Sequence, residues 1–216
     1  RELGASPPDG SAEASGSAEE RMGLGRGDSV EPGLVATREA AMDEDQIYAE
    51  LDRVRDDYRA LLDSATVGEL RQPTNGTKWN NEQLLFHMLF GYLLVRNLRL
   101  IVWGFSRLPD SASRRFAFVL NAGTRPFHVV NYVGSLFGAR VLGYARIQGL
   151  MDRVVTGLQR SLRAQSDESL ARGMHFPVGW DPYFRDFMTL LEVYHYPTQH
   201  YDHHRRQLTL TSARRG

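Results

Sequence analysis

The feature of this sequence most able to do chemistry is a cluster of histidines near the C-terminus. Four of the chain's 7 histidines fall in one short stretch, at His195, His200, His203 and His204. His200 and His204 are spaced i, i+4, which on a helix places two imidazoles on one face with Cβ atoms roughly 5–6 Å apart. Two neutral imidazoles so placed can share one metal ion. The pair therefore indicates a candidate metal site.

A metal on this pair needs a third protein ligand, and His87 is the candidate. It lies in an apolar run at residues 84–89 (LLFHML), where a lone polar ring is unusual. Three histidines with one position left for water are the usual ground plan of a catalytic zinc centre. The plainer alternative is a hydrogen-bonded core histidine at residue 87 and a surface pair near the C-terminus. From the residues alone both interpretations stay open.

The other histidines fit structural or exposed positions better than ligand positions. His128 and His175 lie in irregular segments, and His195 and His203 neighbour the candidate pair. On a helix, His195 points roughly 140° away from His200, at about 100° per residue. We therefore expect none of these four to bind the metal.

Composition restricts both the ligand set and the partners. The chain has no cysteine, which excludes disulfides, cysteine zinc ligands and cysteine nucleophiles. Lys+Arg and Asp+Glu are 26 each, and this balance argues against a nucleic-acid partner. The most apolar stretch, residues 84–105, carries Arg96 and Arg99 near its middle, which disfavours a membrane span. With no signal peptide visible, we expect a soluble, cytoplasmic protein with no membrane partner.

The elements that must position the histidines are helices. Residues 1–41 contain no aromatic residue and are expected to form a disordered tail, with one domain at residues 42–216. Apolar residues spaced three and four apart predict long helices at about 43–64, from 80 to 95 or beyond, 139–165 and 182–210. Glycines and prolines in residues 104–138 predict short helices and loops, and no strand is expected. The predicted fold is all-α, an up-down four-helix bundle with an elaborated helix 2–helix 3 connection.

Two motifs resemble signatures of a known family. Residues 79–87 (WNNEQLLFH) resemble the second-helix signature of the DinB-like (YfiT-like) four-helix-bundle metalloprotein superfamily, which has a tryptophan, a capping residue, a glutamate or glutamine and then a histidine. Residues 200–208 (HYDHHRRQL) resemble its last-helix signature, although Arg206 replaces a common glycine. The resemblance implies His87, His200 and His204 as ligands of a divalent metal such as zinc or nickel, and a homodimer.

The resemblance also implies an activity, since some members transfer low-molecular-weight thiols (bacillithiol, mycothiol or glutathione) to electrophiles. A metal with three histidine ligands can stabilise a thiolate without any protein cysteine. Our first hypothesis is therefore a metal-dependent thiol S-transferase with a small-molecule substrate and no assigned catalytic side chain. Arg205 and Arg206 could bind carboxylates of the thiol, or could equally be cations favoured at a helix C-terminus.

Two hypotheses compete with the transferase. One is a non-catalytic metal-binding bundle that acts as a stress or interaction module, and the other is a purely structural bundle whose histidines never meet.

Two further features of the sequence have roles that stay open. Asp202 or Gln207 could hydrogen-bond the imidazole N–H groups of the ligands. The aromatic segment at residues 116–137 could cap the pocket as a lid, or form secondary core or a dimer interface.

Overall fold

The computed structural model describes residues 43–214, and the predicted disordered tail at residues 1–41 lies outside them. The described part consists of eight α-helices, two three-residue strands and one short 3-10 helix. The elements are α1 (Glu44–Ser64), α2 (Val67–Leu70), α3 (Asn81–Phe105), α4 (Asp110–Ala122), α5 (Thr124–Leu142), α6 (Tyr144–Arg163), α7 (Asp167–Ala171), β1 (Gly173–His175), β2 (Phe187–Thr189), α8 (Leu190–Arg205) and η1 (Ser212–Arg214).

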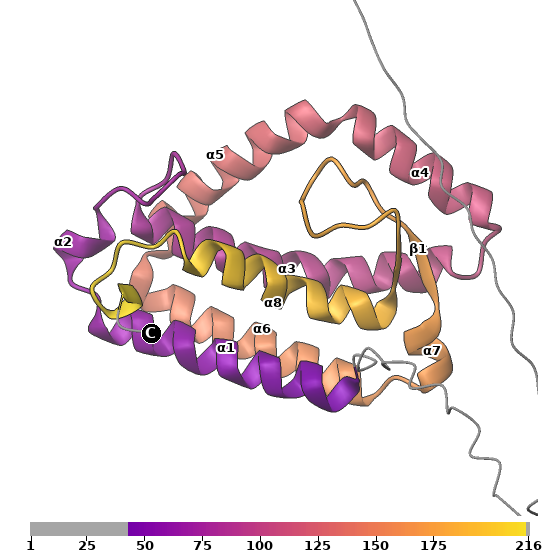
Figure 1. The fold of residues 1–216 in the computed structure, drawn as a ribbon, viewed down its shortest axis with the longest axis horizontal. Coiled ribbons are helices and arrows are strands. Elements are labelled where there is room, and N and C mark those ends of the chain that lie inside the picture. Colours follow the sequence, from indigo (N-terminus) through magenta and orange to yellow (C-terminus); the bar gives the residue numbers. More distant parts are fainter. Residues whose placement is uncertain (1–42, 215–216) are drawn as a thin grey trace, which may run out of the picture. The chain divides into compact units, whose positions relative to one another are not determined.

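Four helices, α1, α3, α6 and α8, form a bundle (Figure 1). Each of them turns an apolar face inward. In α1, for example, Ile47, Leu51, Val54 and Tyr58 recur at spacings of four, three and four and are fully buried. Such a stripe on one side of a helix is stabilised mainly by tertiary packing. The predicted all-α four-helix bundle with an elaborated connection is confirmed.

The direction of the helices follows from that connection. The colours in Figure 1 show that α3 and α6 run the same way, while α1 and α8 run opposite to them. Side-chain contacts agree, because Arg99 near the end of α3 donates to Ser161 near the end of α6. Strict up-down alternation is interrupted once, between α3 and α6. The reason is that α4 and α5 carry the chain back from the last residue of α3 to the end of the bundle at which α3 began. α6 starts there and therefore runs parallel to α3.

This connection is helical where the sequence predicted short helices and loops. α4 and α5 meet at Gly123 and together span residues 110–142. Pro126 falls in the first turn of α5, where a missing backbone N–H costs no hydrogen bond. A Cβ at Gly138 would lie only 2.0 Å from the ring of Phe86, so this glycine lets α5 lie close against α3. Residues that look like helix breakers in the sequence therefore mark a helix start and a close approach.

Two predicted helix starts are wrong. α6 begins at Tyr144 rather than near residue 139, because Gly143 has a φ of 65° and ends α5 one residue earlier. Val141, which falls inside the predicted helix at 139–165, belongs to α5 instead and is 54% exposed there. α8 begins at Leu190 rather than near Pro182. Its start is fixed by Thr189 and Glu192, which form a reciprocal capping box.

The segment before α8 contains a small sheet that the sequence did not predict. β1 and β2 pair antiparallel, with Met174 opposite Met188. Strands of three residues carry too short an alternation to be recognised from the sequence. The loop that connects the two strands, residues 176–186, is long and carries several residues of the candidate site.

Within the described residues, α3 alone is long and apolar enough to cross a membrane by length and composition. Half of the most apolar stretch of α3 is buried inside the bundle, as expected for the core helix of a globular fold. It packs against α8, α5 and α6, and it carries His87. The expected absence of a membrane partner stays a prediction.

Candidate metal centre

Capping boxes fix the two helices that carry the candidate ligands. At the start of α3, the side chain of Asn80 accepts a hydrogen bond from the Gln83 N–H, and the side chain of Gln83 accepts one from the Asn80 N–H. α8 starts with an equivalent pair, Thr189 and Glu192. Because each box satisfies N–H groups that would otherwise lack partners, the start of each helix, and with it the direction of its imidazoles, is set locally.

The structure brings the three histidines of the sequence motifs together. The ring centroids of His87 and His200 are 4.9 Å apart, those of His87 and His204 4.7 Å, and those of His200 and His204 4.5 Å. One nitrogen from each ring lies within 4.8 Å of the others. His87 and His200 are buried and His204 is half-buried. One imidazole from α3 and two from α8 therefore face a common point.

A glycine makes this approach of α3 and α8 possible. A Cβ at Gly91, one turn after His87, would lie 3.0 Å from the Cδ2 atom of His200. That distance is shorter than ordinary carbon contacts of about 3.5–4.0 Å. Any larger residue at this position would press on the His200 ring.

The two imidazoles of α8 are each oriented by an oxygen acceptor. His200 donates from Nδ1 to the carboxylate of Asp181 at 2.8 Å, and His204 donates from Nδ1 to the side-chain oxygen of Gln207 at 2.7 Å. Asp181 also accepts a hydrogen bond from the Tyr196 hydroxyl at 3.0 Å. A histidine that carries its proton on Nδ1 presents the lone pair of Nε2. Metal-binding histidines are commonly oriented by this kind of partner.

His87 has the same tautomer, for a reason that can be followed atom by atom. Its Nδ1 lies 3.3 Å from the hydroxyl oxygen of Ser135 on α5. That hydroxyl donates its single proton to the carbonyl of Asn131 at 2.9 Å, so its oxygen is left to accept from the His87 Nδ1–H. All three histidines therefore offer Nε2 to the shared point. The Nε2 of His200 is buried without a hydrogen-bond partner in the described part of the chain, as expected for an atom that binds a metal.

Burial disfavours the protonated form of two of the three imidazoles. It lowers the pKa of His87 to about 2, with repulsion from His200 and His204 as further causes. Burial likewise lowers the pKa of His204 to about 4. Burial opposes ionisation of Asp181, but its hydrogen bond and charge interaction with His200 lead the effects that hold its pKa below the usual value. At neutral pH, two of the three imidazoles are thus neutral and a carboxylate lies behind the third.

The donor set and its spacing fit a divalent metal ion such as zinc. A tetrahedral zinc with Zn–N bonds of about 2.0–2.1 Å holds its ligand nitrogens about 3.3–3.4 Å apart. The ligand nitrogens would therefore have to move closer together by at most about 1.5 Å, which small side-chain rotations provide.

Beside His87 and His200 lies a cavity of about 20 Å³, which has room for about one water molecule. Aromatic side chains surround it, namely Phe90, Phe127, Trp180, Phe184 and Tyr196.

The structure places Arg205 and Arg206 away from this cavity. The guanidinium of Arg205 pairs with Asp57 at 2.8 Å and also donates to the carbonyl of Ala213. Arg206 is exposed and has no side-chain partner among residues 43–214. Both line an open pocket of about 810 Å³ that none of the three candidate ligands lines. Their proposed role in binding the thiol stays a prediction.

The remaining histidines lie outside the cluster. His195 pairs with Glu50 at 2.7 Å, His203 meets the hydroxyl of Tyr183 at 3.2 Å, and buried His175 lies between two carboxylates, those of Asp110 and Asp186. His128 is exposed on α5, on the rim of a separate pocket beside Trp79.

Sequence reasoning missed two residues that orient the imidazoles. Asp181 lies in the loop between β1 and β2, and Ser135 lies on α5, in a segment for which the sequence predicted only short helices and loops. Neither position belongs to a motif or a periodic pattern, so the sequence gives no signal for them. Of the two candidates named from the sequence, Gln207 does orient His204, whereas Asp202 pairs with Arg53 at 2.8 Å.

These observations define an all-α bundle with a buried cluster of three histidines able to hold a divalent metal. The family model of the DinB superfamily matches residues 50–208, which is most of the chain. The protein belongs to the DinB superfamily. Comparisons with curated proteins and with solved structures gave no match.

Proposed function

We propose that the protein is a divalent-metal-dependent transferase that activates a low-molecular-weight thiol for attack on a small electrophile. The observation that carries the proposal is the convergence of three Nε2 atoms on one point. In the described residues no fourth histidine, aspartate or glutamate joins the group, so a coordination position is left for an exogenous ligand. Zinc and nickel are the proposed metals because imidazole suits both.

The chain's own residues would hold and shield the reacting groups. His87, His200 and His204 are the proposed ligands, and Asp181 holds His200 in the binding tautomer. When bound, the cation would lower the pKa of a thiol and stabilise its thiolate. In the transfer, sulfur bonds to the electrophilic carbon, the leaving group departs with the bonding electrons, and the thiol proton passes to solvent. The aromatic wall around the cavity excludes bulk water from this point.

Arg206 is the better placed of the two arginines proposed to bind the thiol. Its guanidinium has no partner within the described part of the chain, whereas that of Arg205 is already paired with Asp57. Arg206 follows His204 by two residues, at the end of α8. A thiol that placed a carboxylate there would have to reach the histidines around the end of this helix.

One observation favours the alternative, a non-catalytic metal-binding module. The cavity beside His87 and His200, at about 20 Å³, has room for a water molecule but not for a whole thiol and an electrophile. Turnover therefore requires the reactants to enter from a neighbouring pocket or the loop at residues 176–186 to move. A binding module requires neither.

A thiol-transfer assay separates the two functions. The metal-loaded full chain is mixed with mycothiol, bacillithiol or glutathione and with monochlorobimane, which becomes fluorescent when sulfur displaces its chloride. We expect a rate above the free-thiol background that chelation or His204→Ala removes and His195→Gln preserves, because His195 lies on the same helix outside the cluster. A rate equal to background with all three thiols would favour the binding module.

Two further proposals concern the assembly and the location of the protein. We propose a homodimer, supported by the apolar side chains that α4 and α5 expose, such as Phe118 at 75% and Phe137 at 67% exposed. We also propose a cytoplasmic location, which fits a bundle whose most apolar helix is half buried in its own core.

A further inference from the structure

A second hollow lies next to the candidate metal centre and has no assigned role. Its volume is about 380 Å³, far larger than the cavity beside His87. It is lined by the segment just before α3 and by one face of α5, through Lys78, Trp79, His128, Val129, Asn131 and Tyr132. Drug-sized ligands occupy pockets of about 300–1,000 Å³. The pocket is therefore large enough for a small organic substrate.

This pocket shares walls with the metal centre. Trp79 stacks on the ring of His87, with centroids 4.4 Å apart and planes at 29°. Asn131 lines both the pocket and the small cavity beside His87 and His200. A molecule in the pocket would thus contact two side chains, Trp79 and Asn131, that also border the candidate metal centre.

The lining of the pocket favours a flat molecule. Trp79 and Tyr132 stack with ring centroids 6.0 Å apart and planes at 24°, so much of the pocket wall is aromatic. Two buried polar atoms of the lining residues have no hydrogen-bond partner in the described part of the chain, namely the indole Nε1 of Trp79 and the side-chain oxygen of Asn131. Buried polar groups without partners are rare in folded proteins. Because both atoms are shielded from solvent, a polar substituent of the ligand could pair with them only after a side chain of the pocket wall moved.

The charge at the rim favours an acid. Lys78 is the single lysine of the sequence, and within residues 43–214 its ammonium has no hydrogen bond or ion pair. His128 adds an imidazole on the same rim. No carboxylate side chain lines the pocket. An ammonium and an imidazole without a facing carboxylate suit an anionic group of the ligand.

We propose that this pocket binds the electrophilic co-substrate, and that the co-substrate is a flat aromatic acid whose carboxylate lies against Lys78. The role of the ligand as a co-substrate rests on the proposed thiol transfer. The pocket and its preference for acids can be tested without turnover. In the transfer step, sulfur bonds to the ring carbon that bears the leaving group, and that group departs as an anion while the thiol proton passes to solvent.

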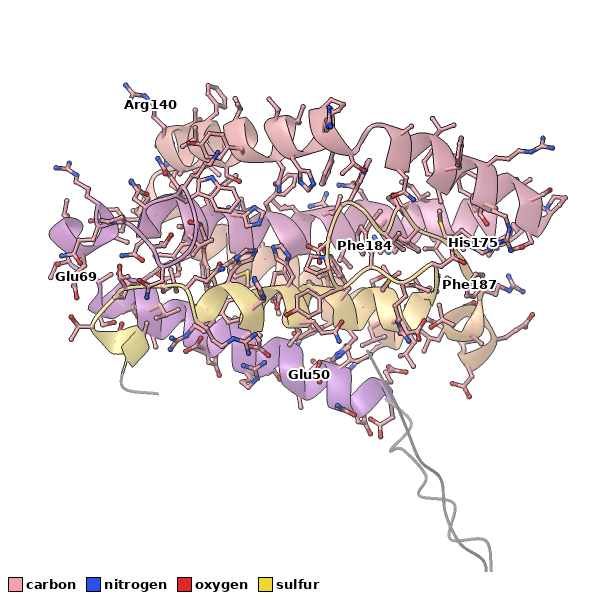
Figure 2. All side chains as sticks on the ribbon, turned by 45° about the horizontal axis from the view of Figure 1, so that its top comes forward. Glu50, Glu69, Arg140, His175, Phe184 and Phe187 are labelled. Carbon is pink, nitrogen blue, oxygen red and sulfur yellow. The ribbon has the colours of Figure 1, made fainter. Side chains whose placement is uncertain are left out.

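Calorimetric titration of the metal-loaded full chain, without thiol, measures the binding. The ligands are 4-chloro-3-nitrobenzoate and its neutral counterpart 4-chloro-3-nitrobenzamide. We expect the acid to bind once per chain and more tightly than the amide. Lys78→Gln should weaken acid binding on the order of 5-fold, the upper range for a charge pair open to water, and leave the amide unchanged. Arg140→Gln is the control, because Arg140 lies on α5 outside the pocket and its side chain points away from the bundle (Figure 2).

A second pair of variants tests the location without touching charge. Val129→Trp fills the pocket and should abolish binding of both ligands, whereas Val133→Trp, one turn further along α5 and outside the pocket, should not. Both valines are more than half exposed, so neither change disturbs the core. Binding that survives chelation of the metal supports the pocket, and binding lost on chelation would show direct coordination and overturn it.

The outcomes also separate this inference from the proposed function. Acid binding that depends on Lys78, without any chloride release on addition of thiol, would support the pocket and contradict the transferase. Turnover of neutral electrophiles, together with equal binding of acid and amide in wild type and Lys78→Gln, would support the transferase and overturn the pocket's preference. No binding of the acid to the wild-type protein would overturn the inference outright.

Discussion

The carboxylate behind His200 gives the sharpest prediction about the metal centre. Asp181 accepts the His200 Nδ1–H at 2.8 Å, and its side chain is 11% exposed. Asp181→Asn keeps the size and an oxygen acceptor but removes the negative charge. Replacing such a partner weakens metal affinity by about 10- to 100-fold, which is about 1.4–2.7 kcal/mol. We expect a dissociation constant for zinc raised by this factor.

The assay is a competition between the protein and a zinc chelator of known affinity, read by the chelator's absorbance. Asp186→Asn is the matched control, because Asp186 lies in the same loop but pairs with His175 away from the cluster. Circular dichroism at the assay temperature checks that both variants are folded, since Asp181 also accepts a hydrogen bond from Tyr196.

Either of two results would refute the reasoning. The first is zinc affinity within twofold of wild type in folded Asp181→Asn. The second is an equal loss in Asp186→Asn, which would mean that the effect comes from the loop as a whole and not from the carboxylate on His200.

Three other predictions concern packing, protons and assembly. Gly91→Ala puts a Cβ 3.0 Å from the His200 ring, and this overpacking should cost about 1–3 kcal/mol, seen as a lower melting temperature or weaker zinc binding; unchanged values in both would contradict the close approach. Because the pKa values of His87 and His204 are lowered to about 2 and about 4, the unfolded chain binds more protons than the folded one below about pH 6.5. The free energy of unfolding of the metal-free protein should therefore fall as pH drops from about 6.5 to 4, by up to about 1.4 kcal/mol per pH unit for each histidine. Urea titrations at several pH values should show that the free energy of unfolding of His204→Asn falls less steeply with pH than that of the wild type. Phe137→Asp on the exposed face of α5 should convert the proposed dimer to a monomer in light scattering, and an unchanged mass would place the interface elsewhere.

The bundle and the three histidines could be predicted because their signals are local. The core stripe of α1 and the capping box before α3 need only a few neighbouring residues to be recognised. The spacing of His200 and His204 is equally local, since an i, i+4 pair faces one side of any helix. The position of His87 in an apolar run then indicates a ring turned toward the core.

The parts that could not be predicted depend on tertiary contacts. In the sequence Gly138 indicates a break in a helix. In the structure it lies inside the continuous helix α5, because only a residue without a side chain fits against the ring of Phe86. Asp181 reads as an ordinary loop acid, because the imidazole that it orients lies 19 residues further along the chain. The pocket beside Trp79 combines the segment before α3 with α5, so the sequence could not show it either.

The central claim is that His87, His200 and His204 hold one divalent metal ion together. The most direct test is the amount of zinc or nickel bound per chain after equilibrium dialysis, measured by mass spectrometry of the metal. We predict one ion per chain in the wild type and in His195→Gln, and far less than one in both His87→Ala and His204→Ala, each shown to be folded. One ion per chain retained in both alanine variants would contradict the assignment of the centre.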